Sequence, residues 1–247
     1  LGDVYKRQVH GEGFDYIFSY AQGGLESLVK NGYEWLYRCP KPTFWRATTD
    51  NDRGSKFHIK SGSWLAADMF IECKDVEVIT DGKSQGKPCA PENNKYGGDV
   101  FAENVIVKYV YETITTPATT VEVVYSVDNK GKIAVNVSYK GAKGLPQLPV
   151  FGLRFIMPTL ADKYTYEGLS GETYPDRMAG AEKGIFEIDD ISLTNYLVPQ
   201  ECGMRMGTEW LEVTRHTSLN NCRKGNSNQI LRIEKKDKGF AFSCLPY

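Results

Sequence analysis

The sequence lacks a long apolar run, an excess of charge of one sign and any regular spacing of cysteines. Its longest apolar stretches are a few residues, far shorter than a membrane-spanning helix requires. Thirty basic residues face 31 acidic ones, so the net charge is −1 and no positive field favours nucleic acid or an anionic membrane. We therefore expect neither a nucleic-acid partner nor a membrane partner.

The six cysteines form no C-x-x-C pair and are separated by long, irregular gaps. A zinc ribbon or a disulfide framework needs a tighter pattern. We expect scattered thiols in a reducing compartment, and hence a cytoplasmic location. Histidine is also scarce, with three residues in no recognisable motif: His10, His58 and His216.

Helical periodicity is nearly absent, whereas period-2 alternation is frequent. Residues 105–112 and 121–127 alternate apolar and polar side chains, and the turn Asp128-Asn129-Lys130-Gly131 leads into a third such run at 133–139. Alternating runs on both sides of an Asn/Asp/Gly turn predict an antiparallel hairpin. The pattern as a whole predicts an all-β fold of packed antiparallel sheets.

Further strands are expected at 14–19, 25–29, 71–79, 150–157, 185–188, 193–198, 210–213, 230–233 and 240–243. The one helix that we expect is short and lies near 64–69, with Ser61 or Ser63 as its N-cap. Residues 81–99 are rich in Gly, Pro, Asn and Lys and are predicted to be a surface loop.

The first eight residues resemble a translated cloning adapter, so we treat 1–8 as non-native and expect them to pack against nothing. Residues 9–247 are expected to form one domain. The chain stops at Pro246-Tyr247, directly after an apolar strand-like run whose edge nothing would cover, which predicts a domain truncated at its C-terminus.

The segment Asp50-Asn51-Asp52 is the most conspicuous polar group. An EF-hand loop would require Gly at its sixth position and Glu at its twelfth, where this sequence has Ser55 and Ser61, so calcium binding by that route is excluded. In an extended segment the two carboxylates would point to the same side. We expect Arg46 to pair with Asp50 or Asp52, since a buried unpaired charge is costly.

Three segments, taken in order, resemble the small-chain domain of glycoside hydrolase family 2 β-galactosidases. Residues 44–54, F-W-R-A-T-T-D-N-D-R-G, resemble the family's F-x-R-A-P-x-D-N-D-x-G, with Thr48 in place of proline. Residues 168–177, G-L-S-G-E-T-Y-P-D-R, resemble G-x-G-P-x-E-x-Y-x-D-R with one residue fewer. Residues 199–205, P-Q-E-C-G-M-R, resemble P-Q-E-x-G-x-R. Upstream, 23–28 resemble the G-x-L-x-S hairpin that opens the domain.

This resemblance implies a large antiparallel supersandwich of the galactose mutarotase type. The parent would be a homo-oligomeric retaining β-galactosidase that cleaves terminal β-galactosides such as lactose. Its two catalytic glutamates would lie on a (β/α)₈ barrel absent from this chain, about 5 Å apart. The chain itself would contribute no catalytic residue and no cofactor. Magnesium and sodium in the parent would be held by residues outside it.

The resemblance also places the first motif beside the sugar pocket. The implied pocket residues are Arg46, Asp50, Asn51, Asp52, Gly54 and Ser55. Tyr174, Asp176 and Arg177 are instead expected to form an internal lock, in which Asp176 and Arg177 pair under the tyrosine ring. The domain would buttress the barrel and complete one wall of the pocket.

Two other functions remain open at this point. A carbohydrate-binding module would use the tryptophans to stack on sugar faces, although buried aromatic packing is more common. An aldose epimerase of the same fold would need a general acid and a general base, typically His with Glu, and the three histidines provide no such motif. The coding sequence upstream separates the three functions, because a barrel in frame would indicate the β-galactosidase.

Overall fold

A computed structural model describes residues 6–86, 100–173, 178–191, 201–217 and 228–246. The chain divides into two compact units, which are described separately. Unit 1 comprises residues 1–46 and 56–157, and unit 2 comprises residues 47–55 and 158–247. The boundary between the units falls inside the first sequence motif, between Arg46 and Ala47.

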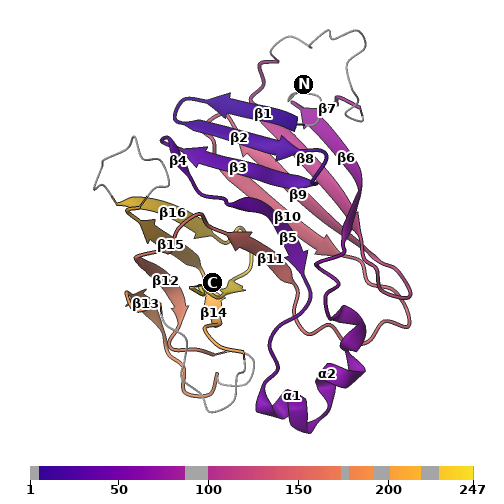
Figure 1. Ribbon diagram of the computed structural model, residues 1–247. Coiled ribbons are helices and arrows are strands. Elements are labelled where there is room, and N and C mark those ends of the chain that lie inside the picture. The colour runs from indigo at the N-terminus through magenta and orange to yellow at the C-terminus, as the bar shows by residue number, and fades with distance from the viewer. Residues whose placement is uncertain (1–5, 87–99, 174–177, 192–200, 218–227, 247) are drawn as a thin grey trace. The chain divides into compact units, whose positions relative to one another are not determined.

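Unit 1 is built on two antiparallel sheets, with a short ribbon beside them (Figure 1). The four-stranded sheet has the order β1 (Lys6–Gly11), β2 (Phe14–Ser19), β3 (Gly24–Lys30) and β4 (Tyr33–Glu34). The five-stranded sheet has the order β10 (Ile133–Tyr139), β9 (Thr120–Asp128), β8 (Asn104–Glu112), β6 (Glu72–Thr80) and β7 (Lys83–Ser84). The ribbon pairs β11 (Gly152–Ile156) with β5 (Arg38–Thr43), and two short helices are α2 (Phe57–Lys60) and the 3₁₀ turn η2 (Gly62–Trp64).

The core of unit 1 lies between its two large sheets. Strands β8 and β9 alternate buried and partly exposed residues, so one face of each strand is apolar and inward. This inward face carries tyrosine as well as valine, and the rings pack against β2. The buried cluster includes Tyr16, Phe18, Leu25, Val107, Tyr109, Tyr111, Val121, Val123, Tyr125 and Val127.

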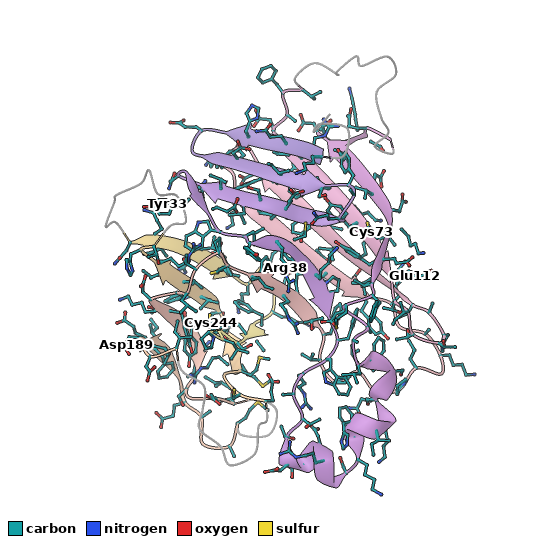
Figure 2. All side chains as sticks on the ribbon, viewed as in Figure 1. Tyr33, Arg38, Cys73, Glu112, Asp189 and Cys244 are labelled. Atoms are coloured by element: carbon teal, nitrogen blue, oxygen red, sulfur yellow. The ribbon has the colours of Figure 1, made fainter. Side chains whose placement is uncertain are left out.

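The buried tyrosine hydroxyls join the two sheets through the turn that precedes β3. Tyr109 Oη donates to the carbonyl oxygen of Gly24 at 3.2 Å, and Tyr111 Oη donates to that of Gly23 at 2.9 Å. Burial raises the pKa of both phenols well above its usual range, so they remain neutral donors. Gly23 has a φ of +61°, and a Cβ there would lie 2.5 Å from Cβ of Cys73 (labelled in Figure 2), so the turn requires glycine.

Unit 2 contains a four-stranded antiparallel sheet and a two-stranded ribbon (Figure 1). The sheet has the order β13 (Lys183–Ile188), β12 (Lys163–Leu169), β15 (Trp210–Arg215) and β16 (Gln229–Glu234), and the ribbon pairs β14 (Arg205–Thr208) with β17 (Phe240–Phe242). Tyr164 and Tyr166 of β12 point into the core, and each ring meets that of Phe242 edge-on at 5.5 Å and 5.3 Å. The helix α1 (Asp50–Gly54) also belongs to this unit.

The expected all-β, antiparallel fold is confirmed, and so is the hairpin of β9 and β10. The helix expected at 64–69 is wrong: residues 62–64 form η2, residues 65–69 form turns, and the α-helices lie at 50–54 and 57–60. The strands that were not expected are β1, β4, β5, β7, β12 and β14. The strand expected at 193–198 lies outside the described residues.

The expectation that residues 1–8 pack against nothing is wrong for the three of them that are described. Lys6, Arg7 and Gln8 form half of β1, which pairs with β2 along its whole length. Arg7 Nε also donates to Tyr20 Oη at 3.1 Å, and Gln8 Nε2 donates to both carboxylate oxygens of Asp15 at 3.0 Å. Whatever their origin, these residues complete an edge strand because strand pairing uses backbone groups that any sequence provides.

Cys39, Cys73 and Cys244 carry free thiols. Burial raises the pKa of each thiol, that of Cys244 to about 11, so these groups are protonated near neutral pH. Among the described residues, none of the helices has the length and apolar content needed to cross a membrane.

Candidate functional site

The first motif begins in the core of unit 1. Phe44 is fully buried, and its ring stacks on Trp64 and Phe151 at 5.4 Å and 6.2 Å between centroids. Two residues later, Arg46 Nε donates to the carbonyl oxygen of Pro149 at 3.2 Å, and its guanidinium lies 5.9 Å from the centre of the Phe57 ring. These contacts fix the segment up to the point where it enters unit 2.

The Asp-Asn-Asp segment is a helix and not the extended segment in which the two carboxylates would point to the same side. Thr49 is the N-cap of α1: its Oγ1 accepts a hydrogen bond from the backbone N–H of Asp52 at 3.2 Å. In return, the carboxylate of Asp52 accepts from the backbone N–H of Thr49 at 2.8 Å. This reciprocal pair is a capping box, which the sequence T-x-x-D indicates. Asp52 therefore fixes the start of the helix.

Asp50 has a different local partner. Its carboxylate forms an ion pair with Arg53 one turn later, and Arg53 also donates to the carbonyl oxygen and the hydroxyl of Thr48 at 3.1 Å and 3.2 Å. Asp50 lies in the first turn and Arg53 in the last, where each charge is favourable to the helix dipole. The pairing of Arg46 with Asp50 or Asp52 would join residues of different units, and it stays a prediction.

The helix α1 exposes most of its polar groups. Asp50, Asn51, Gly54 and Ser55 are exposed, and Asp52 is partly buried. A Cβ on Gly54 would meet no atom within 4 Å among the described residues, and its φ is not positive, so neither strain nor close approach requires glycine there. An exposed cluster of carboxylate, amide and hydroxyl groups provides the donors and acceptors that sugar hydroxyls use.

The third motif reaches the first one within unit 2. The backbone N–H of Ala47, two residues before the N-cap, donates to the carboxylate of Glu201 at 3.1 Å. The sequence analysis used Glu201 to recognise its motif but gave it no role in the site. Because 154 positions separate these residues, no local pattern could have revealed the bond.

The second and third motifs are also hydrogen-bonded to each other. The backbone N–H of Thr173 donates to the carbonyl oxygen of Met204 at 3.0 Å, and the hydroxyl of Thr173 accepts from the N–H of Met206 at 3.0 Å. The three motifs therefore meet in unit 2. The predicted lock of Tyr174, Asp176 and Arg177 lies outside the described residues and stays a prediction.

Arg205, the last residue of the third motif, carries a buried charge. Its Nη2 donates to Tyr164 Oη at 3.4 Å, and its guanidinium lies 5.8 Å from the centre of the Tyr166 ring. Burial raises the pKa of both phenols, while Arg205 opposes that shift. The two phenol contacts hold the guanidinium at the start of β14 in the core of unit 2. They satisfy only part of its hydrogen-bonding capacity, because neutral phenols offer few acceptors.

Within the described residues, no histidine is paired with a glutamate, as an epimerase of this kind would need. His10 is exposed on β1, His58 lies in α2, and His216 in unit 2 contacts the carboxylate of Asp162 through Nδ1. No group of three or more His, Cys, Asp or Glu side chains suited to holding a metal ion occurs within the described ranges.

Comparison with known proteins gives one consistent result. A sequence model of the family described as "Beta galactosidase small chain" matches residues 10–247. The chain is 56% identical to a "Beta-galactosidase small subunit" of Latilactobacillus sakei over 247 residues, which is all of this chain and 77% of the relative.

Longer relatives match over a smaller part of their length. The chain is 38% identical to a "Beta-galactosidase" of Clostridium acetobutylicum over 72% of this chain and 18% of the relative. It is 30% identical to a "Beta-galactosidase" of Streptococcus thermophilus over 96% of this chain and 20% of the relative. The chain therefore corresponds to about a fifth of these longer proteins.

Proposed function

Because the chain belongs to the β-galactosidase small-chain family, we propose that it is the non-catalytic sandwich of a retaining β-galactosidase. It would buttress the catalytic barrel of the same enzyme and complete one wall of its galactose pocket. The observation that carries the proposal is that hydrogen bonds link the three motifs in unit 2, from Ala47 to Glu201 and from Thr173 to Met204 and Met206. We further propose terminal β-galactosides such as lactose as substrates, a homo-oligomeric parent in the cytoplasm, and magnesium and sodium held by residues outside this chain.

The assignment of catalysis to the barrel and of sugar binding to this chain follows from the chemistry of retaining hydrolysis. One carboxyl group protonates the leaving oxygen while a second, about 5 Å away, attacks the anomeric carbon. In our proposal both belong to the barrel. The exposed groups of α1, chiefly Asp50, Asn51 and Ser55, would accept and donate hydrogen bonds to galactose hydroxyls. Arg46 and Gly54 would line the same wall. Interactions of this kind orient the sugar without entering the bond-breaking step.

An apolar segment of unit 1 supports docking to the barrel. Four large side chains in α2 and the turns after it are exposed in water: Ile59 by 67%, Leu65 by 60%, Met69 by 76% and Phe70 by 58%. Exposed apolar side chains gathered in one segment are typical of an interaction surface. We propose that this segment, which we call the 59–70 patch, contacts the barrel, because the similarity to a protein named a small subunit implies a larger partner.

Replacing Met69 and Phe70 together by serine is expected to weaken binding to the catalytic partner by at least tenfold. Stability should change by less than about 0.5 kcal/mol per residue, since both side chains are exposed. A pull-down titration with the purified partner measures the affinity. The matched control is Ile185→Ser with Ile230→Ser, which are 66% and 57% exposed in unit 2. Equal losses in both double variants would argue against a specific contact through the 59–70 patch.

In the assembled enzyme, Asp50→Ala is expected to lower kcat/KM by at least tenfold without changing the melting temperature. Asp50 is 54% exposed and its ion pair with Arg53 contributes at most about 1 kcal/mol, so stability should be little affected. Asp52→Ala should lower kcat/KM as well, but it also removes half of a capping box at a cost of about 0.5–2 kcal/mol.

The matched control for Asp50→Ala is Glu187→Ala, whose side chain is 55% exposed and paired with Lys163. The measurements are steady-state kinetics on a chromogenic β-galactoside and thermal unfolding of the same samples. A lower melting temperature with unchanged kcat/KM in both aspartate variants would mean that α1 is a structural element of an interface and does not line the sugar site.

A further inference from the structure

Helix α1 has no apolar face that packs on a core. It is five residues long, and none of its residues is buried. A helix in a folded protein is normally held by an apolar face packed on a core, and a helix this short is not stable by itself. The capping box and the Asp50–Arg53 pair fix the shape of α1, but both are bonds within the segment 48–53. They define the shape of α1, and its N-cap residue Thr49 is buried.

Glu201 provides an anchor from outside the segment. Its carboxylate accepts the backbone N–H of Ala47 at 3.1 Å, just before the N-cap residue Thr49. A hydrogen bond to a charged acceptor is roughly twice as strong as one between neutral groups. Because Ala47 is itself exposed, no apolar packing of its side chain holds this end of the segment.

The residues that follow Glu201 are held by contacts within unit 2. Two residues after Glu201, Gly203 has a φ of +76°, and a Cβ there would lie 3.1 Å from Leu245. Next come Met204 and Met206, whose backbone groups bond to Thr173. These contacts tie the chain at 203–206, just after Glu201, to two other segments of unit 2.

We propose that Glu201 is a positioning residue for the sugar site: it holds the backbone at Ala47 so that the polar groups of α1 meet the substrate. This inference rests on the proposed function, because it assumes that α1 faces the galactose. Glu201 itself would act through α1 and need not touch the sugar.

The first test measures the position of α1 without any turnover. In the assembled enzyme, Glu201→Ala should accelerate amide hydrogen exchange at Ala47 and through α1, whose amides at Arg53 and Ser55 bond within the helix. Exchange in β12 and β15 should stay unchanged. Glu201→Gln keeps an oxygen acceptor and should restore most of the protection. The control, Glu212→Ala, removes the partner of Arg232 on β15 and should leave α1 unaffected.

The second test separates positioning from folding. Glu201→Ala should lower kcat/KM for a β-galactoside at least tenfold, chiefly through a higher KM, with an unchanged melting temperature and with recovery in Glu201→Gln. Unchanged exchange in α1 would overturn the anchor while leaving the proposed function in place. Faster exchange with an unchanged kcat/KM would overturn the role in the sugar site. If assembled wild-type protein lacks turnover, the proposed function fails, and the exchange experiment still decides whether Glu201 anchors α1.

Discussion

Trp64→Ala is expected to destabilise unit 1 by about 3–5 kcal/mol, the usual cost of removing a large aromatic side chain from a core. Trp64 is fully buried at the end of η2. Its ring stacks on Phe44 at 5.4 Å and meets Tyr139 edge-on at 5.8 Å, and its indole N–H donates to the carbonyl oxygen of Pro146 at 3.1 Å. The substitution leaves a cavity and removes the hydrogen bond to the partly buried carbonyl oxygen of Pro146.

Urea unfolding monitored by far-UV circular dichroism measures this loss of stability. Trp64→Phe should cost less than Trp64→Ala because it keeps most of the ring contacts and loses the indole hydrogen bond. Leu65→Ala, one residue later, should shift stability by less than about 0.5 kcal/mol because Leu65 is 60% exposed. If Trp64→Ala and Leu65→Ala had similar effects, the 62–64 turn would not be part of the core.

The strands with clear period-2 alternation were predictable from the sequence. β8 and β9 bury one face in the core, and β10 partly buries Ile133, Val137 and Tyr139, so alternate residues along these strands are apolar. β5 was missed because Pro40 and Pro42 interrupt it, and proline argues against an interior strand. In the structure β5 pairs with β11 in a two-stranded ribbon, where the missing N–H groups cost little.

The error at 64–69 has a physical cause. Residues 64–69 have the apolar content of a short helix, but Ala66 adopts a φ of +62°, in the left-handed region, so turns follow η2 in place of a helix. The α1 helix was missed because it has no apolar face, so its sequence shows no helical periodicity of apolar residues. The T-x-x-D sequence at Thr49 and Asp52 was the available evidence.

The candidate site was predictable as a set of residues but not as an arrangement. Motif resemblance identified the segments that contain Asp50, Glu201 and Arg205. The bond from Ala47 to Glu201 and the bonds between Thr173 and the third motif depend on long-range folding, which spacing along one sequence does not encode. The division of roles between Asp50 and Asp52 likewise required the geometry of the helix cap.

We propose that this chain contributes to a β-galactosidase site without carrying its catalytic groups. The direct measurement is hydrolysis of a chromogenic β-galactoside by the purified chain alone, by the catalytic partner alone and by the two together. Galactose mutarotation is measured on the same samples.

We expect no turnover above background from the chain alone, because retaining hydrolysis needs two carboxyl groups on opposite sides of one glycosidic bond and our account places both on the barrel. Adding the chain to its catalytic partner should increase turnover until the partner is saturated, and Asp50→Ala should reduce that gain. Acceleration of mutarotation by the chain would instead favour an epimerase. Robust β-galactoside hydrolysis by the chain alone, free of contaminating enzyme, would contradict the account.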